Sequence, residues 1–277
     1  MDISVIVPFY DGNKYIEKLL IVIQKNRNNL AKDGFSSEVI IVNDSPDIPV
    51  TVKDRNLLAD VTVLANPHNE GIHQSRVNGL NTAKGKYVLF LDQDDLISKH
   101  GLLSQIKTIG SYDFVVGNGY KTDSQHKYEL YKTSHEQEKC LKLDYYYYYT
   151  CPIISPGLVL IRKNAIPEEW KTNILQHNGS DDFYLWLLML SDGAKGTINR
   201  DHVYMHVYTG QNTSLDQSYM RESTYECVQK MKGIIPDSKL RCIMRRADYY
   251  SETKGNFFDK CKYLDVGVLR FLFGRLL

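Results

Sequence analysis

The sequence predicts an α/β protein with a mostly parallel, doubly wound sheet, and three observations support that fold class. In the first half of the chain, short apolar runs alternate with segments whose apolar residues recur at helical spacing. The run YVLFL at residues 87–91 is apolar throughout, as is typical of a strand covered on both faces. Acidic residues follow that run directly, and open α/β sheets bind ligands at the carboxyl ends of their strands.

The first 91 residues contain four runs of strand length, each ending at a turn or at polar residues. They cover residues 3–7, 38–42, 61–64 and 87–91. We expect Pro8 to end the first strand and Asp11 to cap the helix that follows it. A helix is expected before the fourth strand, with Leu80 on its buried face and Gly85 at its end.

The second half of the chain continues the alternation less regularly. Helices are expected over 96–109, 218–232 and 239–250, with strands over 112–116, 158–161 and 203–208. The highly charged segment 121–142 predicts a solvated insertion or a mobile flap. Five consecutive tyrosines at 145–149 fit either an aromatic strand, which we favour, or the lining of an acceptor groove.

Composition excludes several classes of protein. A net charge of +1 over 277 residues gives no strong field for nucleic acid. The five cysteines are scattered without a C-x-x-C pair, so neither a zinc site nor a disulfide framework is expected, and a reducing cytoplasm fits. No signal peptide is evident, and the strongly apolar run 183–190 is far shorter than the roughly 20 residues that span a bilayer.

The acidic cluster after the fourth strand is the first candidate site. Asp92, Asp94 and Asp95 lie within four residues, around Gln93, and repel one another. A hard cation would relieve that repulsion, and oxygen ligands of this kind suit Mn²⁺ or Mg²⁺. An acidic loop that caps the next helix is the alternative, because aspartate is a favoured N-cap. The position after a buried strand favours a site for a metal and a diphosphate.

The stretch 69–95 resembles the nucleotide-sugar domain of family-2 glycosyltransferases, which have the GT-A fold with a Rossmann-like, mostly parallel sheet. The positions that match the family pattern, up to its aspartate-rich DxD motif, are Asn69, Gly71, Arg76, Gly79, Ala83, Gly85, Tyr87, Asp92, Gln93 and Asp94. Ser75 and Val77 depart from it, where the family has alanine and asparagine. The resemblance implies a donor site that includes Arg76, Asp92 and Gln93, with Asp94 as a metal ligand.

The ends of the first two strands extend this resemblance. Pro8 and Tyr10 match a family element after the first strand, and Asn43-Asp44 matches an acidic pair after the second, with asparagine in the first place. The resemblance places Pro8, Tyr10 and Asp44 in the donor site and implies that Asp44 accepts a hydrogen bond from a uracil-type base. Taken alone, Asp44 is more typical of a turn or a cap. The segment PFYDGNK lacks the G-x-G-x-x-G of a dinucleotide-binding oxidoreductase.

A second acidic pair, Asp181-Asp182, begins a helix that is apolar all round and therefore predicted to be buried. Helix capping explains such a pair, because free N–H groups and the helix dipole stabilise carboxylates there. It also resembles the family's acid pair before leucine-tryptophan. That resemblance implies Asp182 as the catalytic base, with Asp181 in a supporting or acceptor-binding role.

Two further residues are candidates for the same site. Trp170 is expected either to stack on an acceptor sugar or to support the site by packing, which is the commoner role of a tryptophan. His206 is expected to face the metal or the diphosphate, as basic residues of this segment do in similar enzymes. A single histidine in a strand is more often a packed or surface residue.

We expect a GT-A domain over 1–214, with a nucleotide-sugar part at 1–117 and an acceptor-facing part at 118–214. A C-terminal helical extension is expected over 215–277. Residues 211–214 resemble a loop that closes over the nucleotide in relatives. Apolar residues at helical spacing, with lysines and arginines among them, predict that 256–277 either packs on the domain or lies on anionic lipid.

Together with these residues, the resemblance predicts a metal-dependent, inverting glycosyltransferase that moves a sugar from a nucleotide-sugar donor, a UDP-sugar. The resemblance alone implies the acceptor, a hydroxyl of a glycan or lipid-linked saccharide in the synthesis of bacterial capsule or other cell-surface polysaccharide. We expect it in the cytoplasm, with peripheral contact to the inner face of the plasma membrane as an option. The alternatives are an inactive sugar-nucleotide-binding protein and a sugar-phosphate nucleotidyltransferase, whose glycine-rich basic loop PFYDGNK lacks.

Overall fold

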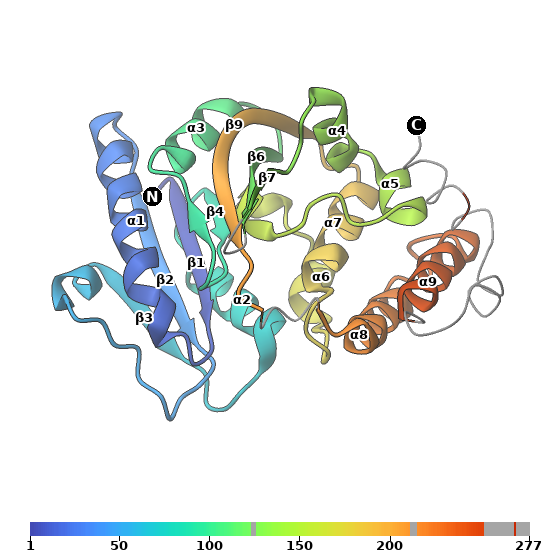
Figure 1. Cartoon of the computed structure of the whole chain (residues 1–277), viewed down its shortest axis with the longest axis horizontal. Coiled ribbons are helices and arrows are strands. Elements are labelled where there is room, and N and C mark those ends of the chain that lie inside the picture. The colour runs from blue at the N-terminus through green and yellow to red at the C-terminus, as the bar shows by residue number, and fades with distance from the viewer. Residues whose placement is uncertain (123–125, 211–214, 252–268, 270–277) are drawn as a thin grey trace. The chain divides into compact units, whose positions relative to one another are not determined.

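The computed structural model describes residues 1–122, 126–210, 215–251 and Leu269 (Figure 1). The chain forms two compact units that are interleaved along the sequence. The first contains Met1–Glu138, Ile153–Ile166 and Ala194–Thr209, and the second contains Lys139–Pro152, Pro167–Gly193 and the residues from 210 onward. Of the expected extension, the helices α8 (Gln217–Lys230) and α9 (Asp237–Ser251) lie within the described residues, and both belong to the second unit.

Within the described residues, the strands of the first unit form one mixed sheet of nine, in the order β3-β2-β1-β4-β8-β6-β9-β5, with β7 paired to β6. The strands are β1 (Ile3–Phe9), β2 (Ser37–Asn43), β3 (Val61–Ala65), β4 (Tyr87–Phe90), β5 (Leu96–Ile97), β6 (Phe114–Thr122), β7 (Lys127–Glu129), β8 (Val159–Arg162) and β9 (Gly196–Val207). Its α-helices are α1 (Asn13–Lys32), α2 (Gly71–Thr82), α3 (Gly101–Ile109) and α4 (Ser134–Glu138). Short 3₁₀ segments lie at Arg55–Leu58, Pro156–Leu158 and Lys163–Ala165.

The four strands predicted in the first 91 residues are present and parallel. β1 pairs with β2 and β4, and β2 pairs with β3. Every residue of β1 and β4 is buried, as predicted for both strands. The α/β fold class is therefore confirmed, and antiparallel pairings add to it from β8 onward, because β8 runs antiparallel to both β4 and β6.

Two of the expected stops in this region are wrong. β1 continues through Pro8 to Phe9, paired with β2. β4 pairs with β1 only as far as Ile6, so the missing N–H of Pro8 removes no bond of that ladder. Helix α2 ends at Thr82, ahead of Gly85. Gly85 is needed for close packing instead, since a Cβ there would lie 2.5 Å from the backbone nitrogen of Ser4.

Two expected helix starts also differ. Asp11 does not cap α1: its backbone has a φ of 44°, and Gly12 takes the N-cap position without a side-chain bond. The helix expected over 96–109 is divided into the strand β5, which pairs with β9, and the helix α3. Leu96 lies opposite Met205, so pairing along β9 overrides the helical periodicity of this segment.

The expected flap at 121–142 is instead largely ordered structure on the sheet. Its described residues form the end of β6, the strand β7 and the helix α4, followed by a 3₁₀ turn at Lys139–Leu141. β7 pairs with β6 in an antiparallel hairpin, with Lys121 opposite Tyr128. Lys121, Lys127 and Lys132 of this segment are exposed, so its charged side chains are solvated, as one of the two alternatives predicted.

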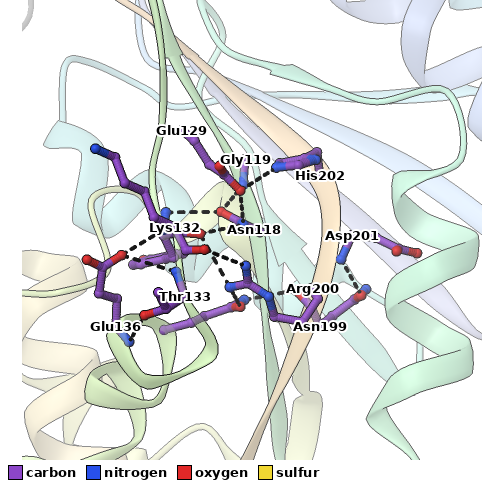
Figure 2. Close-up of polar contacts among 12 residues, drawn as sticks. Asn118, Gly119, Glu129, Lys132, Thr133, Glu136, Asn199, Arg200, Asp201 and His202 are labelled. Carbon is purple, nitrogen blue, oxygen red and sulfur yellow. Dashed lines mark hydrogen bonds and ion pairs between the residues drawn. The ribbon is translucent and has the colours of Figure 1, made fainter.

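The pairing of β6 with β9 contains a bulge, and buried polar side chains satisfy its backbone (Figure 2). The register shifts on both sides of Asn118, whose side chain is fully buried. Asn118 Oδ1 accepts a bond of 3.2 Å from the Tyr131 N–H, and its Nδ2 donates to the Tyr131 carbonyl at 2.9 Å and to Glu129 Oε1 at 3.0 Å. Bulges bend a strand and re-aim its side chains.

A second buried amide side chain, that of Gln137, holds the other side of the bulge. Gln137 of α4 is fully buried and its Nε2 donates to the carbonyls of Val116 at 2.9 Å and Asn199 at 2.8 Å. Its Oε1 accepts a bond of 3.0 Å from Arg200 Nη1. Hydrogen bonds to both β6 and β9 thus stabilise the bulge, and the bulge sets the position of the end of β9.

The second unit is helical over its described residues. It contains α5 (Leu143–Tyr148), α6 (Glu168–Thr172), α7 (Asp181–Ser191), α8 and α9. α7 is buried from Phe183 to Met189, as its apolar sequence predicted. The tyrosine run forms α5 and no strand: the Tyr146 hydroxyl donates to the Cys140 carbonyl at 2.7 Å, and this packing overrides the strand propensity of tyrosine.

Two predictions concern segments that lie outside the described residues. They are the closing loop at 211–214 and, apart from Leu269, the amphipathic segment 256–277. Among the helices that the structure describes, none has the length and apolarity required to cross a membrane.

Candidate active site

The candidate donor site lies where β1, β2 and β4 end, at the same edge of the sheet. Parallel strands bring their carboxyl ends together, and this is where such sheets bind ligands. The loop after β1 is joined to the loop after β2 by the Asp11 N–H, which donates to Ser45 Oγ at 2.9 Å. The structure therefore gathers Pro8, Tyr10 and Asp44 with the acidic cluster after β4.

Asp44 holds the start of helix α2. The residue is 4% exposed, and its Oδ1 accepts bonds of 2.7 Å from Asn66 Nδ2 and from the Glu70 N–H. Its Oδ2 accepts a bond of 2.9 Å from the Gly71 N–H. The capping alternative for Asp44 is thus confirmed, because it satisfies free N–H groups of the helix. An ionised carboxylate has about four acceptor positions, so one remains, and the contact to a base stays a prediction.

Arg76 of α2 forms a buried ion pair with the first acid of the DxD motif. Its side chain is 4% exposed, and its Nη2 lies 2.5 Å from Asp92 Oδ1. The pair ties the helix that Asp44 caps to the end of β4. Arg76 also balances the negative charge of Asp92, one of three in the acidic cluster. The charges of Asp94 and Asp95 need other partners.

Gln93, the middle residue of the motif, connects it to the loop after β1. Its Oε1 accepts a bond of 3.0 Å from the Tyr10 N–H, and its Nε2 donates to the Tyr10 carbonyl at 2.9 Å. A Cβ on Gly12 would lie 2.0 Å from Gln93 Oε1, so this contact requires glycine at 12. Gln93 therefore positions the loop, and it leaves the Tyr10 side chain exposed at the site.

The folded protein disfavours the negative charge of Asp94. Burial, followed by the charges of Asp95 and Asp92, raises the pKa of Asp94 to about 6. A cation would reverse this shift by favouring the carboxylate. In the described part of the chain, histidine, cysteine and acidic side chains form no metal-binding group of three or more. A metal ion here would thus take most of its ligands from a bound substrate or from water.

Asp95, directly after the motif, binds the end of β9. It is 1% exposed and accepts hydrogen bonds from the Tyr204 hydroxyl and, at 2.9 Å, from the Val207 N–H. His206 Nδ1 lies 3.1 Å from Asp95 Oδ1. Burial alone would lower the pKa of His206, but the bond to Asp95 and its negative charge outweigh burial, so the pKa is raised. The structure therefore places a histidine that favours its charged form beside the acidic cluster.

Asp95 and Tyr204 are site residues that the sequence interpretation missed in these roles. The sequence shows Asp95 as a third acid of the cluster, but its partners Tyr204 and Val207 lie more than 100 residues later in the chain. The alternation in VYMHV places Tyr204 and His206 on one face of β9, and this signal could have suggested that both meet the same group.

The second acidic pair lies in the other unit, at the start of α7. Asp181 is 2% exposed, and its carbonyl accepts a bond of 2.8 Å from Trp170 Nε1. Trp170 is itself fully buried, so stacking on an acceptor sugar is the wrong alternative, and support of Asp181 is the role that the structure shows. Asp182 is half-buried, and its Oδ1 accepts a bond of 2.6 Å from the Phe183 N–H. Its assignment as the catalytic base stays a prediction.

The first unit defines a class of protein: an α/β domain of the GT-A type, in which acidic residues gather at the carboxyl ends of parallel strands. The chain belongs to glycosyl transferase family 2, because the model of that family matches residues 4–170, more than half of its length. The family resemblance inferred from residues 69–95 is therefore confirmed.

Similar proteins agree with this family. An uncharacterised glycosyltransferase of Rickettsia felis is 27% identical over 222 residues, which cover 77% of this chain and 34% of the relative. The poly(ribitol-phosphate) β-N-acetylglucosaminyltransferase TarS of Staphylococcus aureus is 38% identical over 108 residues, covering 37% of this chain and 18% of TarS. The chain thus spans about a third or less of the length of these two relatives.

A solved structure shares the fold. The crystal structure of S. aureus TarS residues 1–349 in complex with UDP-GlcNAc matches with a TM-score of 0.62 and 18% identity, covering 90% of this chain and 72% of that one. At this identity the likeness establishes the GT-A fold and carries no residue role across.

Proposed function

We propose that the protein transfers a sugar, with inversion, from a UDP-sugar to a hydroxyl group of a glycan or lipid-linked acceptor. The observation that carries this proposal is the joined arrangement of Tyr10, Asp44, Arg76 and the DxD motif at the strand ends. TarS, which shares the fold, has been crystallised with UDP-GlcNAc and with UDP, which supports a uridine nucleotide as the donor.

The donor nucleotide would lie along the loops after β1 and β2. The remaining acceptor position of Asp44 suits the N3–H of a uracil, and the exposed Tyr10 side chain and Pro8 border the same loop. Gln93 and the Arg76–Asp92 pair hold these loops in place before the donor arrives. Such preorganisation lowers the entropic cost of binding.

A divalent cation, Mn²⁺ or Mg²⁺, fits the acids after β4. The raised pKa of Asp94, caused first by burial and then by Asp95 and Asp92, indicates a negative charge that lacks compensation. Asp94 would hold the ion, with His206 beside it, and the donor phosphates would complete the coordination. When bound, the ion would balance the charge of the leaving diphosphate.

Asp182 would act on the acceptor. Inverting transfer requires a carboxylate that removes the proton from the attacking hydroxyl group. Asp182 is half-buried at the N-terminal end of α7, where the helix dipole favours its ionised form, and the buried Asp181 next to it is fixed by Trp170. These features suit a base that must be negatively charged at neutral pH.

The acceptor is proposed to be a cell-surface polysaccharide or its lipid-linked precursor. TarS is named for transfer to poly(ribitol-phosphate), a polymer of this kind. Peripheral contact of 256–277 with anionic lipid is proposed for the same reason, since lipid-linked acceptors lie in membranes. Deleting residues 256–277 and finding the same membrane-bound fraction would refute that part.

Calorimetry with UDP- and GDP-sugars, with and without Mn²⁺, tests the proposal. We expect binding of a UDP-sugar that strengthens with Mn²⁺, together with release of UDP when the acceptor is present. A protein that binds the donor but transfers no sugar would be the inactive relative, for which the departures at Asn43 and Val77 leave room. Binding of a sugar phosphate with a nucleoside triphosphate would support a nucleotidyltransferase instead.

A further inference from the structure

A lysine beside the acidic cluster has no role in the site described so far. Lys121 lies near the end of β6, directly opposite His206 in the parallel pairing of β6 with β9. Paired residues of neighbouring strands share one face of a sheet, and alternate residues of a strand do the same. Lys121 therefore lies on the face that carries Tyr204 and His206, and it contacts the ring of Tyr208, which follows β9.

The contacts of Lys121 leave its charge available. Its Nζ lies 5.8 Å from the centre of the Tyr208 ring, which is a cation–π contact, and both side chains are exposed. Within the described residues Lys121 forms no ion pair with a carboxylate, whereas His206 contacts Asp95. Lys121 is also close enough to His206 for its positive charge to lower the pKa of that histidine. Two basic groups thus lie side by side next to the acidic cluster.

We propose that Lys121 binds the leaving diphosphate of the donor. This inference rests on the proposed transfer function. In that reaction the bond between the anomeric carbon and the phosphate oxygen breaks, and its electron pair stays on the diphosphate. The acceptor oxygen bonds to the carbon, and its proton passes to a carboxylate. The charge on the diphosphate therefore grows during the reaction, and a lysine ammonium placed there stabilises that charge.

The same hairpin provides a matched control. Lys127 lies opposite Thr122 in the pairing of β6 with β7, so its side chain is on the other face of the hairpin. There its Nζ lies 3.7 Å from the centre of the Tyr120 ring, which stacks on His202. That face also carries the bond of 2.8 Å between His202 and Glu129 (Figure 2). Lys121 and Lys127 are therefore two exposed lysines of one hairpin, and only Lys121 shares a face with His206.

The test is calorimetry with UDP and UMP on wild type, Lys121→Met, Lys121→Arg and Lys127→Met, with Mn²⁺ present. Methionine keeps the apolar stem over the tyrosine ring and removes the charge. We expect Lys121→Met to bind UDP about tenfold more weakly, the size expected for one charged hydrogen bond, and to bind UMP nearly as wild type does. Lys121→Arg should recover most of the UDP affinity, and Lys127→Met should match wild type.

Several results would overturn the inference. They are unchanged UDP affinity in Lys121→Met, an equal loss for UMP and UDP, or an equal loss in Lys127→Met. If Lys121→Met bound UDP as wild type does but had a raised KM for the acceptor, Lys121 would instead bind a phosphate of the acceptor. That result would also refute the inference. Equal melting temperatures of the variants verify their folding. A wild-type protein that binds no nucleoside diphosphate would refute the proposed function itself, and that result is visible before any variant is compared.

Discussion

The two acidic regions of this protein use the same side chain in opposite electrostatic settings. After β4, Asp92, Asp94 and Asp95 lie so close that burial and mutual repulsion raise the pKa of Asp94. At the start of α7, Asp181 and Asp182 occupy the first turn of a helix, where the dipole and free N–H groups favour carboxylates. A cation would stabilise the carboxylates of the first region, whereas the helix start stabilises those of the second without one.

The largest expected effect separates the two regions by activity. Asp182→Asn should reduce kcat by roughly 10²–10⁴, the usual contribution of a general base, because the amide cannot take the acceptor proton. Donor affinity should stay within about twofold, since the change is isosteric and the proposed role of Asp182 concerns the acceptor. UDP release and calorimetry measure the two quantities, with Asp181→Asn as the neighbouring control. Full turnover in Asp182→Asn would remove the base assignment.

The next effect is on stability and concerns Asp92, the acid of the first region that is paired with the buried Arg76. Arg76→Met should lower the free energy of unfolding by about 2 kcal/mol, below the range for fully buried pairs because the Asp92 side chain is 25% exposed. Denaturant unfolding measures it. A double-mutant cycle with Asp92→Asn is the control, and a coupling energy near zero would show that the pair does not stabilise the fold.

A smaller effect is expected on donor binding. Asp94→Asn should weaken binding of the UDP-sugar at least about tenfold with Mn²⁺ and much less without it, because the ion loses its protein carboxylate. Calorimetry at two Mn²⁺ concentrations checks this, with Asp181→Asn as a control in the other acidic region. An equal loss with and without the metal would mean that Asp94 acts on the donor directly.

The smallest effect is on stability as a function of pH, without metal. The pKa of Asp94 is about 6 in the folded protein and 3.8 in its ordinary environment, so the folded state binds the extra proton between these values. The stability that Asp94 contributes should therefore fall as pH rises from about 4 to about 6. At pH 7.5 the Asp94→Asn variant should have a higher Tm than wild type. At pH 4 the two Tm values should be closer together. A constant difference would contradict the raised pKa.

The sequence predicted the first four strands correctly, and it placed the acidic cluster at a strand end, for a physical reason. The run 87–91 has only five apolar residues between polar flanks, a length typical of a buried strand and too short for most helices, and the motif follows within the same segment. The errors fall where tertiary contacts decide, as in the helical tyrosine run, in which Tyr146 is packed by residues distant in the chain.

Long-range pairing also limited what the sequence could show of the site. Gln93 bonds the backbone of Tyr10, 83 residues earlier, and Asp95 bonds Tyr204, 109 residues later. No local pattern encodes such partners. The sequence could propose which residues carry charge at the strand ends, but the structure was needed to show that Asp44 caps α2 and that Asp95 holds β9.

The interleaving of the two units has a consequence for how the chain acquires its fold. β8 lies between β4 and β6 in the sheet, and β9 lies beyond β6, yet both are synthesised after the first segment of the second unit. A nascent chain released at residue 138 would carry unpaired edges on β4 and β6, and such edges invite aggregation. The sheet is completed only once residue 207 has left the ribosome, so slow folding of this unit and a need for chaperones during synthesis are expected.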